Sequence, residues 1–260
     1  MPHPEHKVAI VTGGSRGIGR AIALKLSGLK YSVVVNYATN IVAAEETVQE
    51  IIATGGKAIV VQADVASSDD RTGLLEQTIK AFGRLDVLVN NAGITSQGRK
   101  DILEATEESW DAVLGTNLKG PFFLSQLAAN TMLRLIHAGK TPSGKIINIS
   151  SISAFAISTN RGDYCIAKAA QEMMTGLFAA RLADEKIQVF EVCPGVIASD
   201  MTAPVKEKYD KLIADGLTPI RRWGQPDDVA QAVAALVSDY FPFSTGERYC
   251  VDGGFHLRRL

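Results

Sequence analysis

The chain has 260 residues, a formal net charge of −1 at pH 7 and 46% hydrophobic residues. This length and hydrophobic content predict one α/β domain with a sizeable core. Lysine and arginine are scattered without a basic block, which excludes a nucleic-acid-binding or polybasic membrane surface. No apolar run reaches the ~18–20 residues that a membrane span needs.

Cysteine usage and the first residues indicate the compartment. Cys165, Cys193 and Cys250 are odd in number and form no Cys-x-x-Cys pair, so we expect free thiols in a reducing compartment. The polar residues 1–7 lead directly into a predicted strand, and we expect no signal peptide. A cytoplasmic protein is therefore predicted.

The four histidines are dispersed, and none joins Cys, His or Asp residues at the spacing of a metal site. His3 and His6 share the N-terminus, where an unstructured end is the simpler interpretation. We expect no metal.

Short β-branched runs alternate along the chain with longer segments of helical periodicity. The predicted elements, in chain order, are strand 8–12, helix 18–29, strand 32–36, helix 41–54, strand 58–64, helix 69–82, strand 85–90, helix 109–136, strand 145–150, helix 163–185, strand 187–192, helix 226–237 and strand 247–251. Strands that are apolar on both faces are typical of a parallel sheet covered by helices. The alternation predicts an α/β, single-domain, doubly wound Rossmann fold, with a seven-stranded, mainly parallel sheet and helices on both faces.

One stretch departs from this alternation. Between Pro194 and Pro226 the chain makes a long excursion with a short amphipathic piece at 205–214. Ligands of such sheets lie outside the carboxyl ends of the strands. We expect residues 1–260 to form one dinucleotide-binding and catalytic domain, with a substrate lid near 196–220. A packed pair of surface helices is the alternative.

The segment from residue 8 to residue 19 has the order strand, glycine-rich turn and helix start. Glycines let the backbone turn tightly and approach a pyrophosphate, and a helix N-terminus favours its negative charge. A glycine triple alone is weak, but its place between a strand and an amphipathic helix makes it a strong sign of a dinucleotide site. The predicted contacts are Gly13, Ser15, Arg16, Gly17, Ile18 and Gly19.

The end of the second predicted strand bears on the choice between NAD(H) and NADP(H). NAD sites place a carboxylate there for the ribose 2′-hydroxyl. This chain has Asn36, followed by Tyr37 and Ala38, so no carboxylate repels a 2′-phosphate. Arg16 offers that phosphate a positive charge, although a solvated loop arginine is the plain alternative. The combination favours NADP(H) over NAD(H).

Two further strand ends are candidate cofactor contacts. Asp64 and Val65 follow the third strand, where the carboxylate accepts from the adenine amino group or caps the next helix. After the fourth strand, small residues at Asn91, Ala92 and Gly93 let the chain pass close to a cofactor, although Asn and Gly also favour plain turns. Asn117 lies inside an otherwise apolar helical segment, and its buried amide needs partners, whether its role is catalytic or structural.

Tyr164 and Lys168 are four residues apart on a predicted helix and therefore share one face. Lowering a phenol pKa from about 10 to about 7 needs roughly 4 kcal/mol. An ammonium at ~4 Å supplies about 4 kcal/mol at an effective dielectric of ~20. Ser151, which ends the fifth strand, can donate to a substrate oxygen that gains negative charge. With the glycine turn, these residues predict hydride transfer to a carbonyl.

In order and spacing, these motifs resemble the short-chain dehydrogenase/reductase family over nearly the whole chain. They comprise the turn from Thr12 to Gly19, Asn90-Asn-Ala-Gly93, Asn117, Ser151, Tyr164-x-x-x-Lys168 and Pro194-Gly195. Within the family, the Arg16 turn, the run 35–38 and the ending 251–254 are most similar to 3-oxoacyl-[acyl-carrier-protein] reductases. Sugar and polyol dehydrogenases share these cues, and the segment 153–163, with Asn160 and Arg161, is atypical.

The resemblance implies a role for each matching residue. Tyr164 is implied as proton donor and acceptor, Lys168 as ribose ligand and modulator of the phenol, Ser151 as carbonyl-orienting hydroxyl and Asn117 as support of a water-linked proton relay. The backbone after Pro194 and Gly195 is implied to contact the carboxamide. The remaining implied cofactor contacts are Ile197 and Ser199, with Ser199 where relatives usually carry Thr.

Together these observations predict an NADPH-dependent carbonyl reductase that acts on a 3-oxoacyl thioester or a similar medium-sized ketone. The alternatives are an NAD(P)-dependent sugar, polyol or secondary alcohol dehydrogenase, and a non-catalytic NADP(H)-sensing protein. The resemblance also implies a homotetramer. The two long predicted helices carry more apolar residues than one sheet face covers, which is typical of an interface, and ordinary core is the alternative; these residues include Phe122, Phe123, Met173, Met174, Leu177 and Phe178.

Overall fold

The computed structural model describes residues 6–258, apart from the side chain of Pro204. The first five residues of the predicted polar terminus, His3 among them, lie outside the described part, as do the last two residues of the chain.

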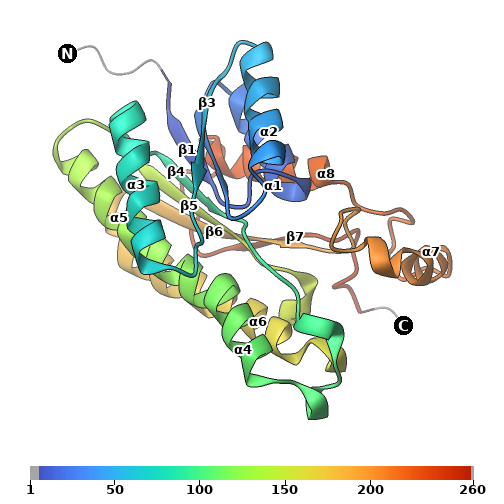
Figure 1. Cartoon of the computed structure of the whole chain (residues 1–260). Coiled ribbons are helices and arrows are strands. Elements are labelled where there is room, and N and C mark those ends of the chain that lie inside the picture. The colour runs from blue at the N-terminus through green and yellow to red at the C-terminus, as the bar shows by residue number, and fades with distance from the viewer. Residues whose placement is uncertain (1–5, 259–260) are drawn as a thin grey trace.

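A single seven-stranded sheet forms the centre of the molecule, and all of its neighbouring strands are parallel (Figure 1). The order across the sheet is β3-β2-β1-β4-β5-β6-β7. The Rossmann-type fold predicted from the alternation is confirmed, and the sheet is wholly rather than mainly parallel. The strands are β1 (Val8–Val11), β2 (Ser32–Tyr37), β3 (Lys57–Gln62), β4 (Val87–Asn90), β5 (Gly144–Ile149), β6 (Ile187–Pro194) and β7 (Arg248–Val251).

The direction of winding reverses at β1. Ile10 of this strand pairs with Val34 of β2 on one side and with Leu88 of β4 on the other. The connections that leave the carboxyl ends of β1 and β4 therefore diverge, and such a switch point is where open α/β sheets bind their ligands.

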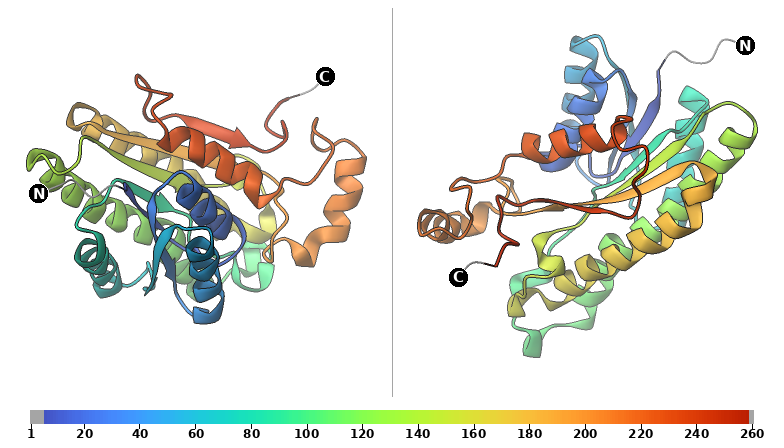
Figure 2. Two further views of the ribbon diagram at one scale, coloured as in Figure 1. Left: turned by 90° about the horizontal axis from the view of Figure 1, so that it is seen from above. Right: turned by 180° about the vertical axis from the view of Figure 1, so that it is seen from behind.

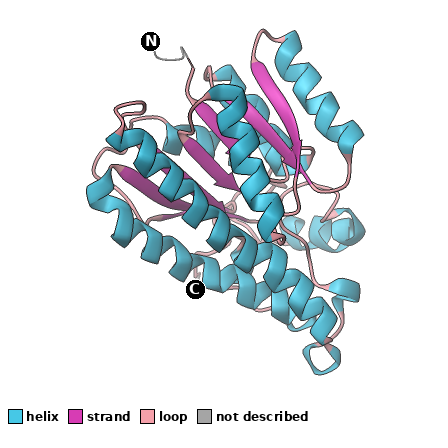
Figure 3. Cartoon of the chain, turned by 60° about the vertical axis from the view of Figure 1, so that its left-hand side comes forward, coloured by secondary structure: helices cyan, strands magenta, loops and turns pink. Residues whose placement is uncertain are grey.

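Helices cover both faces of the sheet, as the views in Figures 2 and 3 show. Within the described residues, no helix has the length and apolarity to cross a membrane. The α-helices are α1 (Gly17–Gly28), α2 (Ile41–Ala53), α3 (Ser68–Phe82), α4 (Glu107–Leu114), α5 (Gly120–His137), α6 (Gly162–Leu182), α7 (Lys206–Ala214) and α8 (Pro226–Val237).

Burial on both faces explains why the strand sequences lack an apolar–polar alternation. Val11, Val35 and Val89 pack with α1, α2 and α8 on one face. Ile10 and Leu88, one residue out of phase, pack with α3, α5 and α6 on the other. Successive strand residues therefore enter opposite cores, and both cores need apolar side chains.

The helix predicted over 109–136 is interrupted. A π-helical turn at Gly115–Lys119 separates α4 from α5. The turn contains Asn117, whose side chain accepts from the Ile94 N–H and donates to the Ile94 carbonyl, both at 2.8 Å. At the start of α5 a Cβ on Gly120 would lie 2.7 Å from the Val65 carbonyl oxygen. The helix widens where it passes the ends of β3 and β4.

The excursion after β6 carries α7 out beyond the carboxyl edge of the sheet (Figure 1, orange). It is tied to the segment before α8 by Trp223, which donates to Asp210 at 2.7 Å and packs edge-on against Tyr209. Few side chains of α7 are buried, Ile213 being one. This position suits the predicted lid, which stays a prediction.

Candidate active site

The glycine turn after β1 forms a cradle that larger residues would fill. Gly13 and Gly17 have φ of +59° and +53°, in the left-handed region that favours glycine. A Cβ on Gly19 would overlap the Gly13 carbonyl oxygen and the Asn91 amide. Arg16 makes no side-chain cap to α1, and the first turn of α1 has no acidic residue. The N–H groups of this turn fit the pyrophosphate of a dinucleotide.

Asn91 and Thr12 brace the cradle from the neighbouring strand. The Thr12 hydroxyl accepts from the N–H groups of Asn91 and Ala92 at 2.9 and 3.0 Å. The Asn91 amide donates to the Thr12 carbonyl at 2.8 Å and to the Gly13 carbonyl at 3.1 Å. The side chain of Asn91, predicted as a cofactor contact, is therefore committed to the protein. The adjoining Gly93 lies next to the side chains of Asn117 and Lys168.

At the end of β2, two of the three predicted cofactor contacts have buried side chains. Asn36 is 1% exposed; its amide donates to the Ala63 carbonyl at 2.9 Å, and its oxygen accepts from Gly13 N–H at 3.3 Å. Tyr37 is also buried, in the core beside α2. Both side chains point into the protein, and the predicted cofactor contact of these two residues stays a prediction. Of the three predicted residues only Ala38 is exposed.

Arg16 lies on the exposed side of the cradle, where its nearest acid is Asp200, at 3.5 Å. Both side chains are more than two thirds exposed, and such pairs contribute only about 0–1 kcal/mol. The guanidinium is therefore held loosely. In the same turn, Ser15 is buried and Ile18 is half-buried. The Ser15 carbonyl accepts from the Thr47 hydroxyl at 3.2 Å.

Asp64 is exposed after β3, and one carboxylate oxygen accepts from Ala66 N–H at 2.9 Å. The cap of α3 is Ser67, not Asp64, so the capping alternative for Asp64 is wrong. The neighbouring Val65 is buried.

Ser151, Tyr164 and Lys168 meet at the carboxyl end of β5. Burial raises the pKa of Tyr164, and a hydrogen bond with Ser151 and the positive charge of Arg161 oppose that rise. Lys168 is 3% exposed; it donates to the Ile149 carbonyl at 2.8 Å, and its Nζ lies 5.7 Å from the centre of the Tyr164 ring. Burial lowers the pKa of Lys168 to about 8, against the opposing charge of Glu191.

These contacts change the expected electrostatics. The ammonium of Lys168 was expected to lower the Tyr164 pKa, but the groups that lower it here are Ser151 and Arg161. Lys168 instead points toward the strand end through its bond to Ile149. At pH 7 its ammonium is still mainly charged, because its pKa lies near 8.

Asn117 is fully buried, and both polar ends of its side chain bind the backbone of Ile94. Its own carbonyl accepts from the amide of Gln171 on α6. The residue thus connects the loop after β4 to the helix that carries Tyr164 and Lys168, which is a structural role whatever its part in a proton relay.

The chain after β6 closes the other side. Gly195 passes so close to β7 that an added Cβ would lie 2.6 Å from the Asp252 Cα. Ile197 is buried. The N–H of Ser199 donates to the Thr202 hydroxyl at 3.0 Å. Pro194, Gly195, Ile197 and Ser199 therefore line the start of the excursion in the predicted order.

Two buried acids beside Tyr164 and Lys168, Asp163 and Glu191, were not predicted from the sequence. Asp163 accepts from Ser96, from Ser109 at 2.6 Å and from the Tyr164 N–H at 2.7 Å. Burial raises its pKa, but these hydrogen bonds outweigh burial and leave the pKa below its usual value. The group fixes the loop after β4 to the start of α6. No sequence signal marks it, since its partners lie 54 and 67 residues away.

Glu191 of β6 is 1% exposed and accepts from the Ser150 hydroxyl. Burial raises its pKa, opposed by the Ser150 hydrogen bond and by the charges of Arg248 and Lys168. A charged residue in the middle of an apolar strand was the available signal.

The histidine expectation also needs a correction. Cys250, Asp252 and His256 bring ligand atoms within 4.8 Å of one another. The Asp252 carboxylate is already engaged, by Gly254 N–H at 2.9 Å, His256 N–H at 3.0 Å and the His256 ring at 2.9 Å. The tight C-terminal turn accounts for this grouping.

Comparison with known proteins agrees with this geometry. A family model described as enoyl-(acyl carrier protein) reductase matches residues 13–256. The 3-oxoacyl-[acyl-carrier-protein] reductase FabG of Staphylococcus aureus is 40% identical over 251 residues, covering 96% of this chain and 98% of that protein.

Solved structures give the same likeness. A 3-oxoacyl-[acyl-carrier protein] reductase from Brucella melitensis, in complex with NAD, superposes with a TM-score of 0.93 and 37% identity over 98% of this chain and 99% of that one. A putative gluconate dehydrogenase from Agrobacterium tumefaciens has a TM-score of 0.88 and 32% identity over 96% and 95%. The chain belongs to the short-chain dehydrogenase/reductase family and is an NAD(P)-dependent oxidoreductase that acts on CH–OH groups.

Proposed function

We propose that this enzyme uses NADPH to reduce the carbonyl group of a 3-oxoacyl thioester or a similar medium-sized ketone. The observation that carries the proposal is the group of Ser151, Tyr164 and Lys168, of which Tyr164 and Lys168 are buried and Ser151 half-buried, at the strand edge that also holds the glycine cradle. A proton donor next to a nicotinamide site is what carbonyl reduction requires.

The proposed mechanism assigns one task to each residue. NADPH, when bound, supplies the hydride. Ser151 donates a hydrogen bond to the carbonyl oxygen, and Tyr164 gives that oxygen its proton as negative charge develops. The charged Lys168 holds ribose hydroxyls, and Ser151 and the charge of Arg161 favour the phenolate left behind. Asn117 keeps the loop after β4 in register with α6 and supports the relay that returns a proton.

Two observations favour the acyl substrate: the names of the relatives and the apolar side chains at the strand ends. The Staphylococcus aureus and Brucella melitensis proteins are named as 3-oxoacyl-carrier reductases. Ile94 and Met201 are both more than a third exposed at the strand ends, and Arg99 joins their loops by donating to the Met201 carbonyl at 3.3 Å. Exposed apolar side chains at the strand ends suit an acyl chain better than a sugar.

Side chains of the predicted lid are engaged within the protein. Ile213 is buried within the lid, Tyr209 packs on Trp223, and Lys206 pairs with Asp210 at 2.7 Å. Because Asp210 neutralises Lys206, the lid offers less positive charge to an acidic carrier protein. The likeness to a putative gluconate dehydrogenase favours, as second candidate, a dehydrogenase of sugar acids or polyols. The buried catalytic group argues against a non-catalytic NADP(H) sensor.

For the cofactor we propose NADP(H) over NAD(H), because Arg16 is exposed beside the cradle and no carboxylate stands at 36–38. One solved relative is described in complex with NAD, so the preference rests on this chain's own residues. The three unpaired cysteines support a cytoplasmic enzyme.

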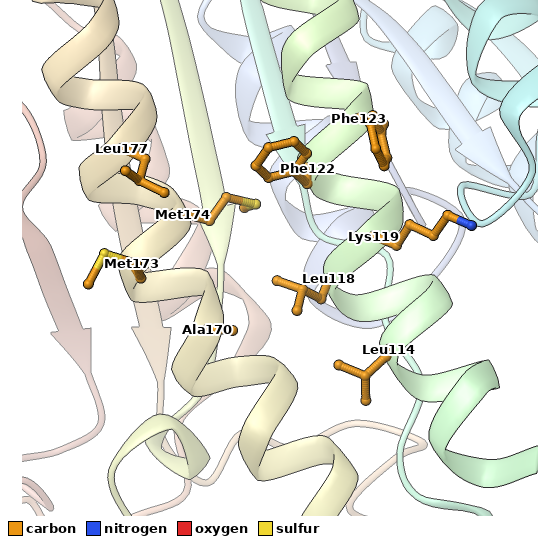
Figure 4. Close-up of a pocket in the computed structure, with 9 residues that line it drawn as sticks. All are labelled: Leu114, Leu118, Lys119, Phe122, Phe123, Ala170, Met173, Met174 and Leu177. Carbon is orange, nitrogen blue, oxygen red and sulfur yellow. The ribbon is translucent and has the colours of Figure 1, made fainter. Parts of the chain in front are cut away.

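For assembly we propose a homotetramer in which α4, α5 and α6 form an interface. An apolar groove runs between these helices, and Figure 4 shows Phe122 and Met174 pointing toward one another across it. Met173 and Leu177 are 67% and 57% exposed. A contiguous apolar surface of this kind marks an interaction site. The lining residues are Leu114, Leu118, Lys119, Phe122, Phe123, Ala170, Met173, Met174 and Leu177.

The substrate proposal predicts that NADPH reduces acetoacetyl thioesters with higher kcat/KM than simple ketones, and that polyols are poorly oxidised. Tyr164→Phe should lower kcat by at least ~10², because the proton donor is lost. Tyr209→Phe, which removes a phenol from the lid, is the control. Efficient polyol oxidation with negligible thioester reduction would assign the second candidate, and tight NADPH binding without any turnover would assign the sensor.

The affinity for NADPH should fall as pH rises through about 8 or somewhat above, because Lys168 is charged below that pKa and neutral beyond it. Losing one charge-assisted hydrogen bond weakens binding by roughly 10-fold or more. Fluorescence titration between pH 6.5 and 9.5 measures the effect. Lys168→Met should bind weakly at every pH, whereas Lys211→Met on the exposed lid should follow the wild type. A flat profile for the wild type would show that the ammonium does not bind the cofactor.

The ratio of kcat/KM for NADPH to that for NADH should narrow about 10-fold in Arg16→Ala, through loss of a charge-assisted bond to the 2′-phosphate. Ala38→Asp should reverse the preference by repulsion, since Ala38 is the exposed residue after β2. Arg20→Ala, whose guanidinium is paired with Glu50, is the control. An unchanged ratio in Arg16→Ala would mean that Arg16 only faces solvent.

Light scattering at micromolar concentration should give a tetramer mass for the wild type and smaller species for Leu177→Arg, because the charge would be buried in the interface. Ile52→Arg, at an exposed apolar site on α2, should leave the mass unchanged. A monomeric wild type contradicts the proposal.

A further inference from the structure

Tyr164 lies between two cations of different surroundings. Lys168, four residues after it, is buried and bound to the Ile149 carbonyl. Arg161, three residues before it, is half-buried, and its guanidinium carbon lies 5.3 Å from the centre of the Tyr164 ring. The proposed chemistry uses Lys168 to bind the cofactor, whereas the one effect described so far for Arg161 is that its charge opposes the rise of the Tyr164 pKa.

The partners of Arg161 are neutral. Its Nε donates to the Ser158 hydroxyl at 3.4 Å, and one terminal nitrogen donates to the Ser153 hydroxyl at 3.3 Å. Throughout residues 6–258, no carboxylate lies within ion-pair distance of it. A guanidinium has five N–H donors, and these two long bonds leave much of its capacity free.

The nearest acid in the sequence is engaged elsewhere. Asp163 is 5% exposed, and its two oxygens accept from Ser96, Ser109 and the Tyr164 N–H. The chain thus places a carboxylate two residues from Arg161 and then satisfies it with hydroxyls instead of the guanidinium. An unneutralised, partly desolvated cation is costly without an anionic partner, so a ligand is the natural source of one.

The position of the cation defines the ligand. Ser151 and Tyr164 bind the carbonyl oxygen in the proposed function, and Arg161 covers the face of that same tyrosine ring. An anionic group that reaches the guanidinium must therefore lie within a few bonds of the carbonyl. The phosphate of a carrier-linked thioester lies many bonds further along its arm and does not meet this condition.

We propose that Arg161 is a receptor for a carboxylate on the substrate, and that the preferred substrate is a free oxo acid whose carboxylate lies one or two carbons from the reduced carbonyl. The inference rests on the proposed carbonyl reduction and changes its preferred substrate from a 3-oxoacyl thioester to a ketone that carries a free carboxylate. Planar, two-pronged guanidinium–carboxylate pairing supplies both orientation and affinity. Reduction then converts the oxo acid to the hydroxy acid, with hydride added to the carbonyl carbon and the Tyr164 proton to its oxygen.

The test compares acetoacetate with methyl acetoacetate, which share a 3-oxo group and differ in the carboxylate charge and in one methyl group. The wild type should reduce the acid with at least ~10-fold higher kcat/KM than the ester. Arg161→Gln should erase this preference, mainly through the KM for the acid, with the ester changed only a few-fold. Arg161→Lys should recover part of the loss. Arg181→Gln, on the exposed end of the same helix, is the matched control.

The outcomes separate the inference from the function on which it rests. Equal losses for acid and ester in Arg161→Gln would mean that the arginine acts on Tyr164 and would overturn the receptor. A wild type that reduces the ester or a thioester better than the acid would also overturn the receptor. The proposed carbonyl reduction would stand in that case. If neither compound is reduced, the proposed function fails, and calorimetric binding of acetoacetate to the enzyme with NADP⁺ decides. Binding lost in Arg161→Gln supports the receptor, and no binding by the wild type rejects it.

Discussion

The hydrogen bonds between Thr12 and Asn91 join the ends of β1 and β4, the two strands from which the chain winds in opposite directions. Because the glycine cradle follows one strand and Gly93 follows the other, these bonds set the distance between the cofactor cradle and the catalytic side chains. Asn117 and Gln171 extend the same connection to α6. The site is therefore a property of the sheet edge and not of a separate loop.

A second theme is the burial of ionisable groups around that edge. Tyr164, Lys168 and Glu191 are each at most 7% exposed, and burial shifts the pKa of each toward its neutral form. Groups with perturbed pKa values gather at active sites, where a catalytic acid or base works best with a pKa near the operating pH. Their mutual charges partly offset burial, so Lys168 and Glu191 keep each other closer to the ionised state.

Local patterns made the fold predictable, and with it the grouping of Ser151, Tyr164 and Lys168. The glycine turn and the Tyr164–Lys168 spacing each lie within one short segment, where a few residues determine the backbone. Features that depend on distant partners were not predictable: the π-helical break at Asn117 depends on Ile94, and the inward side chain of Asn36 depends on Ala63 and Gly13. The hydroxyl pair that satisfies Asp163 also comes from far along the chain.

The loop after β4 is fixed at two points, by Asn117 at Ile94 and by Asp163 at Ser96, whereas the residues that follow are mostly exposed. Mutations in that outer part can alter the entrance without displacing Gly93 or the helix that carries the tyrosine. Descendants of this chain can therefore change the molecules they accept by small steps while the chemistry survives every step.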